Sequence, residues 1–298
     1  MSFSATEAAF EGFRLVRRNP MALVWWTLAY LAFLALLLAA GGSSLISIIT
    51  MMDQFSSGGR EPSVSELEAM GQAYFGIIAW ALPLTVLFGA MLSAAVARGV
   101  VRPREGAFGY LRIGMDEVRV IVVTLVLMIL FCAVMFAGGL AVGVVVGLAS
   151  AGDSSWGLLA GIVVGLLMAA LAIWLMVRFS LAIPITVAER RIAIFDSFGL
   201  TKGRFWPLLG MAVLAAVMSL VVAILGGLAT LPITMMTGGM AALRDLENAS
   251  LLEIARTAWP TLLALGVVRA LLSALQLAVI YAPFSAAYRD LTGKGEAA

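Results

Sequence analysis

The chain has 298 residues, of which 62% are hydrophobic and only 12% are charged. Soluble domains carry roughly 25% charged residues, so this composition excludes an ordinary soluble domain and indicates a chain surrounded by lipid. The formal net charge of +2, with basic residues scattered over short loops, argues against nucleic-acid binding.

Six apolar segments follow one another along the chain, each at least as long as the roughly 20 residues that cross a bilayer. They cover residues 20–52, 73–97, 120–149, 157–177, 207–236 and 258–288. Lys and Arg in short loops stay on the cytoplasmic side. The two termini and the second and fourth loops hold 15 of the 19 basic residues, against 3 in the other loops. We therefore predict six spans with both termini in the cytoplasm.

The residues before the first span predict a short amphipathic helix. Ser4 and Glu7 have the spacing of a capping box, and Asn19-Pro20 supplies a cap and a first-turn proline for the span that follows. One face of this helix is apolar and the other is charged: Phe10, Phe13 and Val16 against Glu7, Glu11, Arg14 and Arg18. Such a helix is expected to lie in the plane of the lipid headgroups.

A stretch that mixes aromatic and basic residues precedes each odd-numbered span, at 10–18, 108–119 and 195–204. The ends of two even-numbered spans also match, LSAAVAR at 92–98 and FSAAYR at 284–289. This pattern predicts three repeat units within a single transmembrane domain of residues 1–298, approximately 1–98, 99–190 and 191–298. Each unit is a short interfacial helix followed by a helical hairpin.

The cytoplasmic stretches supply a candidate binding surface for anionic lipid or for a protein partner. Its basic residues are Arg14, Arg17, Arg18, Arg102, Arg104, Arg112, Lys202 and Arg204. Simple anchoring and orientation of the spans is the alternative use of the same residues, because basic side chains near span ends also fix topology.

Glycines recur every fourth residue in the third and fourth spans. They are Gly139, Gly143 and Gly147 in the third span, and Gly157, Gly161 and Gly165 in the fourth. Small residues at this spacing let helix backbones approach closely in lipid, where association depends on van der Waals contact. We expect the two glycine ridges to face each other in a tight hairpin, or one of them to face another subunit or a membrane partner.

Arg269 is the one charged residue well inside an apolar segment, and Ser273 and Gln276 follow it on the same helical face. An arginine within a span is a candidate functional residue, so these three define a candidate intramembrane polar site. The alternatives are that Arg269 extends its side chain to the outer headgroups or pairs with an acid of the outer loop such as Glu253.

Side chains for catalysis and metal binding are scarce. The chain has no histidine and one cysteine, which removes the commonest general base and the usual soft metal ligands. The sequence therefore predicts a protein that is not an enzyme and that uses no cofactor or metal.

Residues 178–184 (RFSLAIP), 188–189 (AE) and 197–206 (SFGLTKGRFW) resemble a pattern in a loose group of bacterial inner-membrane proteins. The group includes the membrane domain associated with some glycerophosphoryl diester phosphodiesterases, and stand-alone members of no assigned role. The resemblance implies a six-helix bacterial membrane domain. It transfers no activity, because the phosphodiesterase chemistry of those fusions resides in a separate soluble barrel with catalytic histidines.

Together these features predict an all-α polytopic membrane protein of about six transmembrane helices, arranged as three hairpins with short cytoplasmic interfacial helices. The expected location is the bacterial inner membrane, with contact to the lipid bilayer. The leading hypothesis is a non-enzymatic protein that binds lipid or a protein partner, a second copy included. The alternative is a transporter or channel for a small or amphipathic solute, which would use Arg269 and Gln276.

Overall fold

The computed structural model describes residues 4–58, 63–151, 156–236 and 251–293, and within those ranges the chain forms helices and no strand. Six of the helices are long and apolar enough to cross a membrane. They are α3 (Pro20–Gly58), α4 (Val64–Val101), α5 (Met115–Ala151), α6 (Trp156–Phe179), α9 (Phe205–Met236) and α11 (Leu251–Thr292). The predicted all-α class with six spans is therefore confirmed.

Two helix starts show how local sequence sets these boundaries. Helix α3 begins at Pro20 directly after Asn19, as the proline predicted. Helix α4 begins at Val64 rather than near 73, because a capping box holds its first turn. Ser63 Oγ accepts from the Glu66 amide at 3.4 Å, and Glu66 Oε2 accepts from the Ser63 amide at 2.8 Å. The S-x-x-E spacing at 63–66 is the signal for this earlier start.

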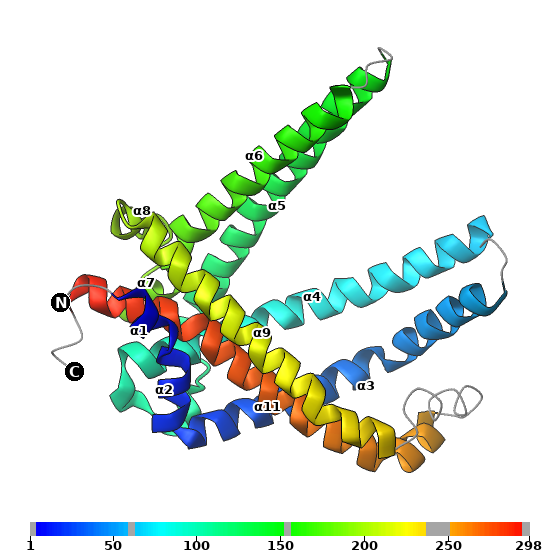
Figure 1. The fold of residues 1–298 in the computed structure, drawn as a ribbon. Coiled ribbons are helices and arrows are strands. Elements are labelled where there is room, and N and C mark those ends of the chain that lie inside the picture. The colour runs from blue at the N-terminus through cyan, green and yellow to red at the C-terminus, as the bar shows by residue number, and fades with distance from the viewer. Residues whose placement is uncertain (1–3, 59–62, 152–155, 237–250, 294–298) are drawn as a thin grey trace.

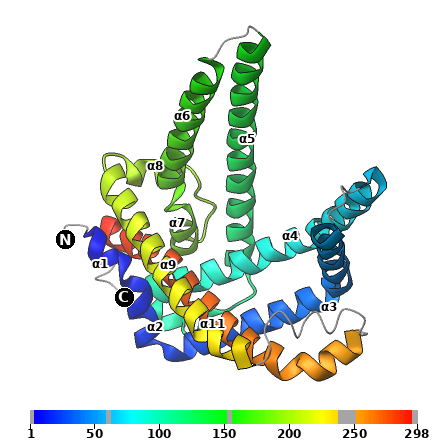
Figure 2. The same ribbon diagram turned by 45° about the vertical axis from the view of Figure 1, so that its right-hand side comes forward.

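The long helices form three antiparallel hairpins, α3/α4, α5/α6 and α9/α11, which leave a common base in different directions (Figures 1 and 2). The short helices lie at this base: α1 (Ala5–Ala9), α2 (Glu11–Arg18), the 3₁₀ turns η1 (Pro103–Glu105) and η2 (Ala107–Tyr110), α7 (Ala182–Glu189) and α8 (Asp196–Thr201). The base holds the ends of the spans nearest the arginine-rich segments.

The packed core also lies in the base. Its largest fully buried side chains include Trp26, Leu92, Leu181, Leu208 and Tyr288, which come from α3, α4, the turn before α7, α9 and α11. Toward the hairpin tips most apolar side chains are exposed instead, as at Phe136 of α5, which is 70% exposed. In a bilayer such a surface meets lipid chains that are as apolar as leucine. The protein's own packing therefore concentrates at one end of the spans.

The predicted polarity of the first short helix is wrong. Helix α2 buries Glu11, Gly12 and Leu15, whereas Phe10 is 46% exposed. A Cβ atom on Gly12 would lie 2.6 Å from the Ala278 carbonyl oxygen, so the α2 backbone packs directly on α11.

The buried Glu11 carboxylate lies 3.2 Å from Arg289 Nη1, with Arg14 and Arg18 nearby at 3.6 and 4.0 Å. These arginines make its burial tolerable, because buried charges need partners.

The two glycine ridges do not face each other, so the first of the two predicted arrangements is wrong, and a single ridge facing another subunit stays a prediction. The α6 ridge does face α5: added Cβ atoms on Gly157, Gly161 and Gly165 would lie 2.1, 2.6 and 4.0 Å from side chains of α5. Added Cβ atoms on Gly139, Gly143 and Gly147 would meet nothing within 4 Å, so that ridge points out of the hairpin. The α6 glycine groove is filled instead by three side chains of α5: Val142, Val146 and Ala149.

We expect Gly161→Leu to loosen the α5/α6 hairpin, because the new side chain would collide with Val146. Overpacking of this kind costs about 1–3 kcal/mol. Gly143→Leu on the open ridge is the matched control, and its hairpin should unfold as the wild type does. Thermal unfolding of both variants in detergent measures the difference; equal losses would contradict the assignment of the two ridges.

Candidate functional site

A buried arginine joins three elements at the base. Arg98, in the last turn of α4, is 1% exposed. Its Nη1 donates to the Tyr110 carbonyl oxygen at 2.8 Å, and its Nη2 donates to the Glu117 carboxylate on α5. The Arg98 Nε atom is buried and has no hydrogen-bond partner within the described structure. One side chain therefore fixes the end of α4 against η2 and the start of α5.

The η2 turn that Arg98 holds has a strained backbone. Phe108 and Tyr110 have φ angles of 51° and 65°, on either side of Gly109 at 66°. The left-handed region is costly for residues other than glycine, so neighbouring contacts must hold it. The Trp26 indole Nε1 donates to the Gly109 carbonyl oxygen at 2.8 Å, and the Trp25 ring packs edge-on against Phe108. The stretch between the second and third spans is thereby fastened to the first span.

A second arginine extends the network to α7. Arg102, which caps α4, donates through Nη1 to Asp116 Oδ2 at 3.2 Å. Its Nη2 donates to the carbonyl oxygens of Val187 and Ala188 near the end of α7. Asp116 also accepts from Arg119 at 2.8 Å. Arg102 thus ties the first hairpin to the second.

Glu105 of η1 forms ion pairs with further arginines of this network. Its carboxylate accepts from Arg112 Nη1 at 3.0 Å and from Arg190 Nη2 at 3.2 Å, and it lies 3.9 Å from Arg102. The whole cluster contains five arginines (Arg98, Arg102, Arg112, Arg119 and Arg190) and three carboxylates (Glu105, Asp116 and Glu117). It keeps a formal charge of +2, which favours an anion beside it.

This arginine cluster encloses a polar pocket of about 370 Å³. Arg98, Arg112, Arg119 and Arg190 line it together with the three carboxylates of the cluster. Arg112 and Arg190 are the accessible members, with side chains 47% and 63% exposed. We call this space the arginine pocket.

An apolar groove of about 550 Å³ adjoins the arginine pocket. Side chains of α3 and α4 form most of its wall, including the stacked rings of Phe33 and Phe88, and α5 contributes Ile121. Two residues, Ile113 and Glu117, line both the groove and the arginine pocket. The site is therefore amphipathic: apolar between the spans and cationic at the base.

The structure separates the predicted basic residues into three groups. Arg102 and Arg112 belong to the arginine cluster, and Arg14 and Arg18 lie beside Glu11. Arg17, Arg104, Lys202 and Arg204 are exposed, and within the described ranges they form no ion pair. Lys202 and Arg204 lie on the turn between α8 and α9, away from the arginine pocket.

Sequence reasoning missed Arg98, Arg119 and Arg190 as members of the site. The signal was the alternation of basic and acidic residues over 98–119, where Glu105, Asp116 and Glu117 stand among the arginines. Acids interleaved with arginines in a segment between two spans indicate an ion-pair network rather than a uniformly basic surface.

The predicted intramembrane polar residues serve different purposes in the structure. Arg269 is exposed at the side of α11, and Gln276 Nε2 donates to the Ser219 carbonyl oxygen of α9 at 3.2 Å. Ser273 is half-buried on the same helix. The side chain of Glu253, the suggested partner of Arg269, lies outside the residues whose side chains are described. Gln276 thus links the two helices of its own hairpin.

The six apolar helices make this chain an integral, multi-pass membrane protein in contact with a lipid bilayer. Comparison with family models, with curated proteins and with solved structures found no match.

Proposed function

We propose that this is a non-enzymatic membrane protein that binds an anionic phospholipid of the cytoplasmic leaflet. The lipid phosphate lies in the arginine pocket, and an acyl chain lies in the apolar groove between α3 and α4. The observation that carries the proposal is that the two spaces are neighbours, because Ile113 and Glu117 line both of them.

The chemistry of the two spaces supports this occupant. Arginine presents planar donors that suit phosphate oxygens, and the cluster has more arginines than carboxylates. Arg112 and Arg190 are the arginines of the pocket that an occupant can reach, because their side chains are 47% and 63% exposed. An occupant that is anionic at one end and apolar at the other matches both surfaces, whereas a soluble anion would leave the groove unused.

The location belongs to the same proposal. The segments richest in Lys and Arg lie at the base, and basic short loops face the cytoplasm. We place the base, with both chain ends, on the cytoplasmic side of a bacterial inner membrane, in keeping with the resemblance to membrane domains associated with glycerophosphoryl diester phosphodiesterases.

The double variant Arg112→Gln/Arg190→Gln tests the proposal. Each arginine near an anionic surface contributes about 1 kcal/mol of attraction, so the pair contributes about 2 kcal/mol. We expect about a 30-fold weaker apparent affinity for phosphatidylglycerol, with little change for phosphatidylcholine. Native mass spectrometry of the detergent-solubilised protein, titrated with each lipid, measures both affinities.

Lys202→Gln/Arg204→Gln is the matched control, because it removes the same charge from exposed residues away from the pocket. This control should keep the wild-type affinity for phosphatidylglycerol. Equal losses in the two double variants would show general charge attraction and would refute the arginine pocket as the binding site.

A further inference from the structure

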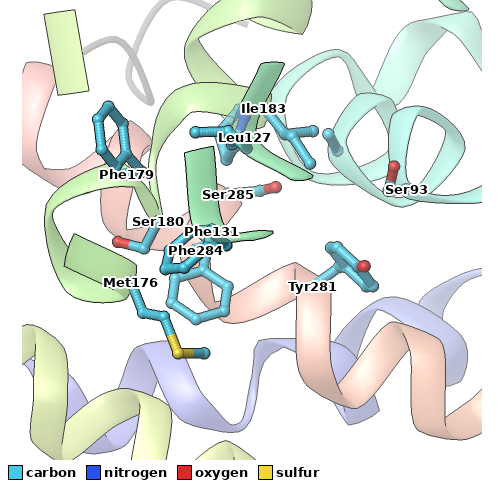
Figure 3. Close-up of a pocket in the computed structure, with 12 residues that line it drawn as sticks. Ser93, Leu127, Phe131, Met176, Phe179, Ser180, Ile183, Tyr281, Phe284 and Ser285 are labelled. Carbon is cyan, nitrogen blue, oxygen red and sulfur yellow. The ribbon is translucent and has the colours of Figure 1, made fainter. Parts of the chain in front are cut away.

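A second cavity lies where the three hairpins separate (Figure 3). Its volume is about 220 Å³, and α4, α5, α6, α7 and α11 all contribute to its wall. The lining side chains are apolar except for hydroxyl groups, those of Ser93, Ser180, Tyr281 and Ser285. No charged side chain lines it, which distinguishes it from the arginine pocket.

The three serines occupy equivalent places in the chain. Each stands in a similar tetrapeptide near the base end of the second half of a hairpin, LSAA at 92–95, FSLA at 179–182 and FSAA at 284–287. Ser93 Oγ donates to the Ala90 carbonyl oxygen at 3.1 Å, and Ser180 Oγ donates to the Val177 carbonyl oxygen at 2.8 Å. Each of these two hydroxyls therefore donates its hydrogen to the backbone carbonyl oxygen three residues earlier in the chain. Each predicted repeat unit thus contributes one serine to the wall of the cavity. A larger side chain at any of these three positions would fill part of the cavity.

The depth of the cavity points to its occupant. Ser93 and Ser285 precede Arg98 and Arg289 by five and four residues, which is about 6–8 Å along a helix. The two arginines pair with Glu117 and Glu11 at the base, the polar end of the spans. The cavity is therefore one to two turns farther into the bilayer, at the depth of lipid chains.

Water is a poor occupant of this space, because a buried water needs two to four polar partners. Only four hydroxyl groups interrupt the apolar wall, and those of Ser93 and Ser180 already donate to backbone carbonyl oxygens. An empty space of this size would forfeit packing contacts. The wall is open to the side, since Met176 is 60% exposed. Hydrocarbon from the bilayer has both access and a matching surface.

We infer that this cavity holds an acyl chain of a bilayer lipid, inserted between α6 and α11. Tyr281 lies four residues farther from Arg289 than Ser285 does, so its ring lines the cavity at the depth of lipid chains. The inference depends on the membrane setting alone and not on the arginine pocket.

Photo-crosslinking tests the inference. The wild-type protein is reconstituted with phosphatidylcholine that carries a diazirine in one acyl chain, transferred to lipid-free detergent and then irradiated. Crosslinks at Phe131, Met176 and Phe284 should survive the transfer, because the cavity retains its chain. Crosslinks at Phe136, which is 70% exposed on the open side of α5, should be lost. Equal loss at both places would overturn the inference.

Two variants sharpen the test. Ser180→Leu fills the cavity and should lower the retained crosslinks at least tenfold, whereas Ser219→Leu on α9, outside the cavity, should leave them unchanged. Unchanged retention in Ser180→Leu would also overturn the inference. Arg112→Gln/Arg190→Gln should leave these crosslinks intact, which separates this result from the outcome for the arginine pocket.

Discussion

Arg98→Leu is expected to destabilise the protein by about 3–5 kcal/mol, because it leaves the Glu117 carboxylate buried without its partner. The loss also frees the Tyr110 carbonyl oxygen and the strained η2 turn. Chemical unfolding in detergent, followed by tryptophan fluorescence, measures the change in the free energy of unfolding.

A second variant separates the loss of the Arg98–Glu117 ion pair from the cost of leaving the Glu117 carboxylate charged and unpaired. Glu117→Leu in the same chain should restore part of the stability, since removal of both partners leaves no unpaired charge. Arg112→Leu is the exposed control: its side chain is 47% exposed beside Glu105, so it should cost no more than about 1 kcal/mol. A loss in Arg98→Leu no larger than that of the control would contradict the structural role of Arg98.

Gly12→Val is expected to detach α2 from α11. The new Cβ would lie 2.6 Å from both the Ala278 carbonyl oxygen and the Val279 Cα, and backbone atoms cannot rotate aside as side chains do. We expect at least the roughly 1–3 kcal/mol typical of overpacking, together with loss of the contact between Glu11 and Arg289. Limited proteolysis should cut the segment around α2 faster than in the wild type.

Gly199→Val is the matched control for this prediction, because a Cβ on Gly199 of α8 meets nothing within 4 Å. Its stability should stay within about 1 kcal/mol of the wild type, the usual range for exposed helix positions. Equal effects of the two substitutions would show that close backbone contact at Gly12 does not stabilise the base.

Hydropathy was sufficient to predict the class and the six spans, because a segment that crosses lipid must be apolar along its whole length. It could not predict which side of a span packs, since lipid and protein neighbours favour the same side chains. The two glycine ridges illustrate this limit. They have identical spacing, yet Gly161 packs against Val146 while Gly143 lies open.

The charges at the base were harder to predict for a different reason. Glu11 has the local pattern of an exposed residue, and it is buried because Arg289, at the far end of the chain, pairs with it. Arg98 meets Glu117 from another helix in the same way. The candidate site consists of such long-range pairs, so its arginines were visible in the sequence but their arrangement depended on the fold.

The divergence of the hairpins has a mechanical consequence. The α5/α6 pair contacts the rest of the described protein mainly through the end of α4, α7, α8 and α9, while side chains farther out, such as Phe136 and Leu166, face lipid. Exchanging one hydrocarbon neighbour for another yields almost no free energy, so nothing in these outer surfaces draws the tips together. We therefore expect the described outer parts of the hairpins to adjust their spacing to the lateral pressure of the membrane, with the salt-bridged base as the stiff joint of each hairpin.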